Sequence, residues 1–218
     1  MRGPTGDSDI VIVGAGGFAR EVHTWLPDVY PADKHQFKGF LGRDDSIVPG
    51  TILGDPLGYS PEPDERFILA IGDIEVRKKV CETLREKRAE FIHFVHPTSL
   101  IAPSATIGIG AVIYPFAVVS NQATLGDFAH LSLHASVGHD AVTGANCYLA
   151  PYSTLNGVSR IGDDVLVASH ATVASGVSVG NRSKVAANSS AMHDAHDDSI
   201  IFGVPGRRAS RVECEGST

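Results

Sequence analysis

An apolar residue recurs at every sixth position from Ile101 to Val185, and this period constrains the fold more than any other feature of the chain. Thr143 is the one member of the series that is not aliphatic, and a small or compact residue follows each member four positions later. A helix needs a period of about 3.6 residues and an ordinary strand a period of about two, so neither explains a sustained period of six. The pattern predicts a β-helix built from hexapeptides.

Each hexapeptide is expected to form one flat face of a triangular prism. The aliphatic residue points into the bore, and the small residue lets the chain turn the corner. Three hexapeptides then make one coil of 18 residues, and the fifteen hexapeptides of this chain make about five coils. The phase already fits at Val95 and Ser99, so the prism is expected to begin near Phe94.

The segment before the repeats has the pattern of alternating strands and helices, which predicts a small open parallel sheet with ligands at the carboxyl ends of its strands. We therefore expect a Rossmann-like α/β domain at residues 1–93, with residues 1–8 as a loose leader, and a β-helix domain with a C-terminal tail at residues 94–218. The expected strands are residues 10–13, 36–41, 51–53, 66–71 and 91–95, and the expected helices are residues 20–26 and 74–88. The apolar side of the second helix should carry Val76, Val80, Cys81 and Leu84.

A glycine-rich turn follows the first expected strand. The run Gly14-Ala15-Gly16-Gly17-Phe18-Ala19 fits the pattern G-x-G-x-x-(G/A), in which glycines let a pyrophosphate approach backbone N–H groups at the start of a helix. A structural turn with nothing bound is the alternative. The acid that would hold a ribose about 20 residues later is not clearly present, because Gly42 and Arg43 follow the second strand, and this favours a nucleotide other than NAD. Asp73 is a good helix N-cap and, with the three glycines, a candidate substrate-binding residue.

The formal charge of −7 disfavours nucleic acid and anionic membranes as partners, since both need a basic surface. Three cysteines without pairing or metal spacing indicate a reducing compartment. With no apolar run approaching 18 residues, a cytoplasmic location is expected. His193 and His196 lie among acidic residues, a pattern that favours a solvated loop over a metal site, so no metal is expected.

Six short motifs occur in order between Ile10 and Arg208. They are Val13-Gly14-Ala15-Gly16-Gly17, Ala70-Ile71-Gly72-Asp73 with Arg77, Val95-His96-Pro97-Thr98, Val137-Gly138-His139-Asp140, Leu155-Asn156-Gly157-Val158 and Phe202-Gly203-Val204-Pro205. Taken together, they resemble the NeuD/PglD type of sugar acyltransferase. The resemblance implies a Rossmann-like domain followed by a left-handed β-helix. It also implies transfer of an acetyl group from acetyl-CoA to an amine or hydroxyl, commonly on a nucleotide-linked amino sugar or on sialic acid.

By this resemblance His139 is the general base, because a neutral imidazole can take the proton of the acceptor as it attacks the thioester. Asp140 would orient and charge-stabilise His139, which needs the geometry of a corner because adjacent strand residues point apart. One coil after His139 comes Gly157, which would leave room for the thioester and offer a backbone N–H to the oxyanion. The alternative is that His139 is an ordinary outward-facing polar residue.

The resemblance also implies that coenzyme A lies outside the prism toward its C-terminal end, and that the protein is a homotrimer with active sites between subunits. His134 and His170, with Tyr152 between them in one column, could line a groove between subunits or be merely exposed. Ser132 stands where the family often has an asparagine near the acceptor, and this departure, like Gly42, makes the acceptor less certain. The coenzyme candidates are Gly157, Ser175, Arg182, Lys184, Val204, Pro205, Arg207 and Arg208, and ordinary surface charge is the alternative for the basic ones.

Three other functions stay open at this point. A γ-type carbonic anhydrase shares the prism, and His134 and His139 have the spacing of two of its zinc ligands, but Thr98 stands where the third is expected. A non-enzymatic assembly scaffold is the second alternative, and the pairing of His139 with Gly157 argues against it. O-acetylation of sialic acid or another small hydroxyl acceptor is the third. Neither this choice nor the acyl chain length follows from the residues.

Overall fold

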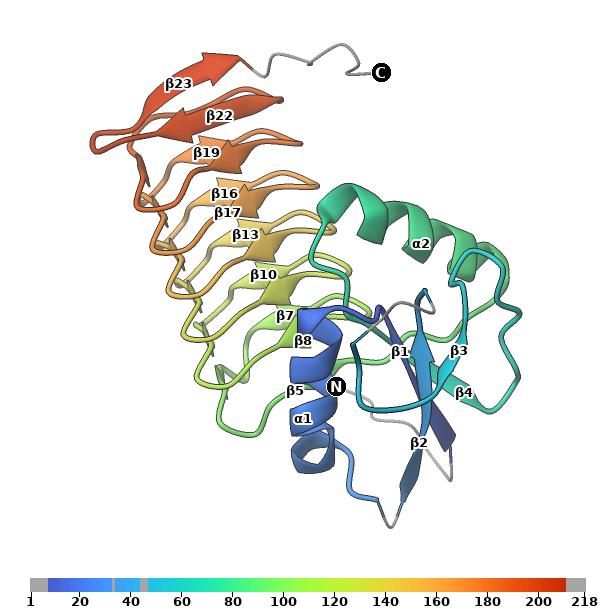
Figure 1. Cartoon of the computed structure of the whole chain (residues 1–218). Coiled ribbons are helices and arrows are strands. Elements are labelled where there is room, and N and C mark those ends of the chain that lie inside the picture. The colour runs from blue at the N-terminus through green and yellow to red at the C-terminus, as the bar shows by residue number, and fades with distance from the viewer. Residues whose placement is uncertain (1–7, 33, 44–46, 211–218) are drawn as a thin grey trace, which may run out of the picture.

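The computed structural model describes residues 8–32, 34–43 and 47–210, and Figure 1 shows an α/β part lying beside the first coils of a long β-helix. The α/β part contains a four-stranded parallel sheet in the order β3-β2-β1-β4. Its strands are β1 (Ser8–Val13), β2 (His35–Leu41), β3 (Ile52–Gly54) and β4 (Glu65–Leu69), and its helices are α1 (Gly17–Val29) and α2 (Ile74–Glu86). The expected small parallel sheet is confirmed.

The two helices cover opposite faces of this sheet. Side chains alternate along β1, so Ile10 and Ile12 pack with α1, whereas Val11 and Val13 pack with α2. Both apolar layers continue into the β-helix, through Tyr114 on the α1 side and Phe128 on the α2 side. The α/β part therefore shares its core with the first coils.

Several expected element boundaries differ from the structure by a few residues. Ser8 belongs to β1 and is buried, so it is not part of a loose leader; residues 1–7 lie outside the described residues. The segment 91–95 is not one strand, because Phe91 forms an isolated bridge with Phe67 and β5 contains only Phe94–Val95. Val76 was expected on the apolar side of α2 and is exposed instead, since it lines a cleft at the end of the sheet.

The β-helix has three sheets, and it begins at Phe94 as expected. Their strands are two residues long and parallel, except for the four-residue β22 and the antiparallel β23. Up to β21, paired strands are 18 residues apart, as in the pairing of Leu131 with Leu149. The first sheet contains β5 (Phe94–Val95), β8 (Val112–Ile113), β11 (His130–Leu131), β14 (Tyr148–Leu149), β17 (Leu166–Val167), β20 (Lys184–Val185), β22 (Ser199–Phe202) and the antiparallel β23 (Arg207–Ser210). The second sheet contains β6 (Leu100–Ile101), β9 (Val118–Val119), β12 (Ser136–Val137), β15 (Thr154–Leu155), β18 (Thr172–Val173) and β21 (Ser190–Ala191). The third sheet contains β7 (Thr106–Ile107), β10 (Thr124–Leu125), β13 (Val142–Thr143), β16 (Arg160–Ile161) and β19 (Ser178–Val179).

The bore is filled by both columns of the repeat. The aliphatic residue and the small residue four positions later are buried together in one continuous core. The chain turns one residue before the small residue, at a position whose φ angle is positive, such as Asn146 at 55° or Tyr152 at 61°. The small residue was expected to make the turn itself, but the turn is made by the residue before it. Its side chain instead points into the narrow corner inside the bore, where only a small group fits.

Neighbouring coils are fixed against each other by side chains that cap backbone groups. Asp163 Oδ1 accepts a hydrogen bond from Ala145 N–H, one coil earlier, over 2.7 Å. A Cβ atom at Gly144 would lie 2.3 Å from the same oxygen, so the preceding glycine is required. The same arrangement recurs where Asn181 Oδ1 accepts from Asp163 N–H over 2.8 Å, beside Gly162.

A buried arginine joins α2 to the β-helix. Arg77 Nε donates to Asn146 Oδ1 and Nη2 donates to the Asn146 carbonyl, both over 2.6 Å. Burial lowers the pKa of Arg77 to about 10, so the guanidinium remains charged at neutral pH. Nη1 lies 3.4 Å from Nδ1 of buried His130, whose pKa is lowered well below its ordinary value by burial and by the charge of Arg77. His130 is therefore the neutral partner of this pair.

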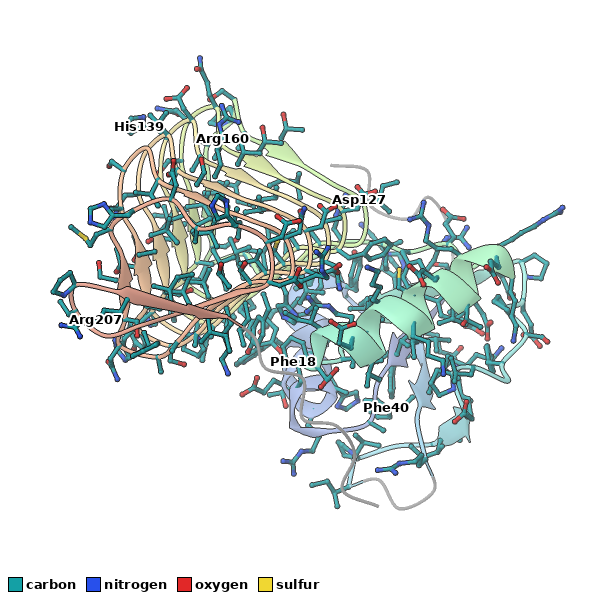
Figure 2. The ribbon with its side chains drawn as sticks, turned by 90° about the horizontal axis from the view of Figure 1, so that it is seen from above. Phe18, Phe40, Asp127, His139, Arg160 and Arg207 are labelled. Carbon is teal, nitrogen blue, oxygen red and sulfur yellow. The ribbon has the colours of Figure 1, made fainter. Side chains whose placement is uncertain are left out.

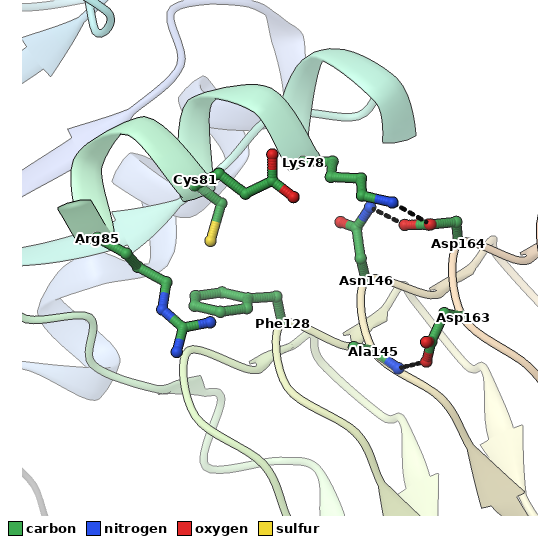
Figure 3. Close-up of a pocket in the computed structure, with 9 residues that line it drawn as sticks. Lys78, Cys81, Arg85, Phe128, Ala145, Asn146, Asp163 and Asp164 are labelled. Carbon is green, nitrogen blue, oxygen red and sulfur yellow. Dashed lines mark hydrogen bonds and ion pairs between the residues drawn. The ribbon is translucent and has the colours of Figure 1, made fainter.

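Figure 3 shows the outer side of the same junction, where a cavity of about 150 Å³ lies between α2 and the corners of the β-helix. Asp164 accepts hydrogen bonds from Lys78 Nζ over 2.7 Å and from Asn146 Nδ2 over 2.8 Å. At the other end of the cavity, the guanidinium of Arg85 lies 5.7 Å from the ring centre of Phe128. These contacts hold α2 on one edge of the prism.

Candidate active site

His139 and Asp140 stand at a corner of the β-helix, directly after β12. The φ angle of Asp140 is 58°, and this left-handed turn brings two adjacent side chains to the same side of the chain. Nδ1 of His139 lies 2.8 Å from Oδ2 of Asp140. The carboxylate can accept the Nδ1 proton and leave the lone pair on Nε2. The side chain of His139 is 67% exposed.

Gly157 lies against the imidazole of His139, one coil later. A Cβ atom at Gly157 would be 2.5 Å from Nε2 and 2.7 Å from Cε1 of His139. The absence of a side chain therefore makes room for the imidazole ring itself, and not only for a substrate. Ser175 is exposed in the same column, one coil beyond Gly157.

Replacement of Gly157 by alanine should lower by about 10²-fold the acetyl transfer that the sequence resemblance implies, because the new methyl group must push the imidazole aside and a displacement of about 1 Å can cost that much. The melting temperature should stay close to that of the wild type, since the displaced ring is exposed. Steady-state rates and thermal melts of both proteins test this. Gly58→Ala controls for the substitution itself, since Gly58 has an ordinary φ angle and a Cβ atom there would meet only the Asp55 carbonyl oxygen, at 3.8 Å. Unchanged turnover in Gly157→Ala would contradict the role given to this contact.

The glycine-rich turn borders a cleft of about 710 Å³ at the carboxyl ends of the sheet strands. Gly14 and Gly16 line it on one side, and Arg43, Asp55 and Val76 are among the residues around it. Gly14 has a φ angle of 124°, and a Cβ atom there would lie 2.4 Å from the Ala70 carbonyl oxygen, so only glycine fits.

Gly17 lines a neighbouring cleft of about 580 Å³ at the first turns of α1. Arg20 and Glu21 of α1 form one wall, and Tyr148 of the β-helix forms another. This cleft thus lies between the α/β part and the first face of the prism. Ser132 is buried on the same face.

Asp73 occupies the N-cap of α2, as expected from the sequence. Its Oδ1 accepts a hydrogen bond from Val76 N–H over 2.9 Å. The carboxylate is engaged by its own helix, whereas Gly72 beside it reaches the cleft at α1. The substrate-binding role given to Asp73 remains a prediction.

His134 belongs to a column of stacked rings on another corner. Its ring is 5.1 Å from Phe116 and 4.7 Å from Tyr152, and Tyr152 is 5.0 Å from His170. Within the described ranges, no group of three His, Cys, Asp or Glu side chains is placed to hold a metal ion. His193 and His196 are exposed in the loop before β22.

The coenzyme candidates are spread over the C-terminal coils. Arg182 is engaged by acids, since Nη2 lies 2.7 Å from Asp198 Oδ2 and 3.4 Å from Asp197 Oδ2. Lys184 is exposed on β20, and Val204, Pro205 and Arg207 are exposed at the hairpin of β22 and β23. The side chain of Arg208 lies outside the described residues. Among the helices described, none is long and apolar enough to cross a membrane.

A family model named the PglD N-terminal domain matches residues 9–84, which form most of the α/β part. Over 51 residues the chain is 41% identical to the UDP-N-acetylbacillosamine N-acetyltransferase of Bacillus subtilis (strain 168). That stretch covers 23% of this chain and 24% of the relative, so the match spans about a quarter of the relative's length.

Solved structures match the α/β part and the β-helix together. PerB from Caulobacter crescentus, in complex with CoA and GDP-perosamine, is 28% identical with a TM-score of 0.84, over 93% of this chain and 98% of that chain. A histidine-to-asparagine variant of the perosamine N-acetyltransferase of that organism, with the same two ligands, gives 26% and 0.82, over 94% and 98%. The acetyltransferase domain of PglB from Neisseria gonorrhoeae, with acetyl coenzyme A, shares the fold at 24% identity and a TM-score of 0.81, over 94% and 100%. The chain has the fold of hexapeptide-repeat sugar N-acetyltransferases.

Sequence reasoning brought His139, Asp140 and Gly157 together correctly, but it missed two features of the molecule. The buried anchor Arg77 was noted only as part of a motif, on a helix whose charges indicate a solvated face. Phe116 was not placed in the column of His134 and Tyr152. The signal was present there, because these residues are 18 positions apart.

Proposed function

We propose that the protein transfers an acetyl group from acetyl-CoA to the amino group of a nucleotide-linked amino sugar, with His139 as the general base. The observation that carries this proposal is the position of the His139 imidazole, hydrogen-bonded to Asp140 on one side and lying against Gly157 on the other. Support comes from PerB, which is similar over nearly the whole chain and was solved with CoA and a nucleotide sugar.

The chemistry assigned to these residues is general base catalysis. Asp140 holds the Nδ1 proton of His139, so Nε2 takes the proton of the acceptor amine as nitrogen attacks the thioester carbon. Gly157 N–H donates a hydrogen bond to the carbonyl oxygen as it becomes negative. His139 then returns its proton to the departing sulfur as the carbon–sulfur bond breaks. Asp140 balances the charge of the imidazolium while it exists.

The two substrates are assigned to different parts of the molecule. The cleft at Gly14 and Gly16 is proposed for the nucleotide, whose phosphates would lie against the N–H groups at the start of α1. The pantetheine arm is assigned to the column of Gly157 and Ser175, and it would lead to the exposed apolar hairpin at Val204 and Pro205. Lys184 and Arg207 are proposed for its phosphates, because Arg182 is already paired with acids.

The proposal includes a homotrimer with active sites between subunits and a cytoplasmic location. Figure 2 shows His139 well away from Phe18, which lines the cleft at α1, so one copy alone does not bring the base to that cleft. Buried thiols at Cys81 and Cys147 are in keeping with a reducing compartment.

The experiment that tests this function is release of free thiol from acetyl-CoA in the presence of a panel of GDP-, UDP- and dTDP-linked amino sugars, their hydroxyl counterparts and sialic acid. Turnover is expected with one or more of the nucleotide-linked amino sugars. Mass spectrometry of the product should show one added acetyl group on nitrogen. Turnover with sialic acid alone would establish O-acetylation instead, and thiol release independent of any acceptor would contradict both.

A further inference from the structure

A buried histidine lies beneath the glycine-rich turn. His130 belongs to β11 in the first sheet, and only 1% of its surface is exposed. Its Nδ1 accepts the hydrogen bond from Nη1 of Arg77, since a guanidinium can only donate. The ring is neutral, so its proton is on Nε2, and this atom has no hydrogen-bond partner among the residues that the structure describes. An unpaired buried N–H group lowers stability, so folding alone does not explain a histidine at this position.

Phe18, the residue that follows the glycine-rich turn, covers the face of this imidazole. The two rings are stacked, with centres 3.8 Å apart and an interplanar angle of 30°. The hydroxyl of Tyr114, which follows β8 in the same sheet, donates to the Phe18 carbonyl oxygen over 3.2 Å. Figure 2 labels Phe18 where the α/β part meets the β-helix. Both the side chain and the backbone of Phe18 are therefore held by the first face of the prism.

The glycine-rich turn has few other means of keeping its shape. Between Gly14 and Phe18 the one residue with a side chain is Ala15, and glycine leaves the backbone more freedom than any other residue does. The N-cap of α1, Gly16, makes no side-chain hydrogen bond, and the first turn of α1 contains no acidic residue. The N–H groups of this turn have no acceptor within the helix. Their direction thus depends on the anchor at Phe18.

His130 also links this turn to the start of α2. Nε and Nη2 of Arg77 bind Asn146, which leaves Nη1 for the imidazole. Asn146 Nδ2 donates to the carbonyl of Ile74, the first residue of α2, over 3.1 Å. Gly72, just before α2, lines the same cleft as the first turn of α1. One side chain therefore contacts the anchors of both segments that border this cleft.

Imidazole is suited to this position because it meets two requirements at once. A hydrocarbon ring could stack on Phe18 but could not accept from Arg77, and an amide could accept but has no aromatic ring to stack. We propose that His130 is a positioning residue for the nucleotide. Through Phe18 it fixes the direction of the N–H groups at the start of α1 that bind the phosphates. The inference rests on the proposed function for the class of ligand, a nucleoside diphosphate.

Two substitutions separate the two properties of the imidazole. His130→Phe keeps a ring beside Phe18 and loses the acceptor for Arg77, whereas His130→Gln keeps an acceptor and loses the ring. Isothermal titration of the full-length protein with GDP, UDP and dTDP should show that the wild type binds at least one of them. For that nucleotide, His130→Gln should raise Kd by about tenfold or more, and His130→Phe by less than about threefold. The melting temperature should be lower in His130→Phe, because Nη1 of buried Arg77 loses its partner. A role in stability alone predicts that Kd and melting temperature rank the variants in the same order.

The control is Val167→Ala, which opens a cavity in the bore two coils beyond the strand of His130. It should lower the melting temperature and leave Kd within about twofold of the wild type. Phe18→Leu should raise Kd as much as His130→Gln does, and the double variant should bind no more weakly than either, because each removes the same contact. Phe18→Leu carries the test if circular dichroism shows the His130 variants to be unfolded.

Equal Kd values in the wild type and folded His130→Gln would overturn the inference, as would weaker binding in His130→Phe than in His130→Gln. A wild type that binds none of the three nucleotides would also overturn it. Binding in the expected order, by a wild type that transfers no acetyl group to any acceptor, would sustain the positioning role and reject the proposed function. Acetyl transfer by the wild type, with nucleotide binding unchanged in His130→Gln, would do the reverse.

Discussion

Replacement of His139 by alanine should lower kcat for acetyl transfer by about 10²–10⁴-fold, the range that a positioned general base contributes. The loss should appear in kcat more than in the affinity for acetyl-CoA, because the imidazole acts on the acceptor proton. Folding should be unaffected, since the side chain is exposed on the surface of the β-helix. In the related perosamine N-acetyltransferase, a histidine variant was still solved with CoA and GDP-perosamine.

The matched control is His193→Ala, which removes an exposed histidine from the loop before β22. This variant should keep the wild-type rate. Stopped-flow and steady-state measurements with the best acceptor of the panel give kcat, and calorimetric titration gives the affinity for coenzyme A. If His139→Ala kept a kcat within a few-fold of the wild type, the proton would have to leave by another route and the mechanism would be wrong.

Replacement of Arg77 by alanine should lower the free energy of unfolding by about 2–5 kcal/mol, through a cavity and unpaired buried groups. The guanidinium is the partner of both the carbonyl and the side-chain oxygen of Asn146, and it contacts His130 as well. Arg77→Lys should lose much of the same energy, because a single ammonium group cannot reproduce the fork.

Urea denaturation followed by circular dichroism measures this effect. Lys79→Ala, an exposed change on the same helix, should stay within about 0.5 kcal/mol of the wild type. Equal midpoints for Arg77→Ala and Lys79→Ala would show that the junction of α2 with the β-helix contributes little to stability.

The fold could be predicted from the sequence because the six-residue repeat determines most of it. An aliphatic residue at every sixth position leaves few other structures, and the contact of His139 with Gly157 follows from adding one coil. The boundaries of strands and helices in the α/β part were harder to predict, because the ends of a short strand depend on neighbouring strands that are distant in the sequence. Val76 was assigned to the core because it is apolar and lies near Val80, but its side chain faces a cleft instead.

Arg77 illustrates a second limit. Amphipathic periodicity tells which side of a helix is apolar, and it does not reveal that a charged residue on that side will find a carbonyl and an amide on another part of the chain 69 residues later. The function proposed for the candidate site was inferred from motif resemblance. Periodicity alone predicts that His139 lies on the surface, and it indicates no function for this residue.

The stacking of coils also restricts how such a chain can change its length. Residues 18 positions apart lie beside each other in most coils, so adding a hexapeptide between His139 and Gly157 would rotate the glycine to another corner and separate the pair. An insertion between Ala145 and Asp163 would break their capping contact in the same way. Insertions outside the segment from His139 to Gly157 leave this pair together. This restriction agrees with the sequence, in which the fifteen repeats contain no inserted residue.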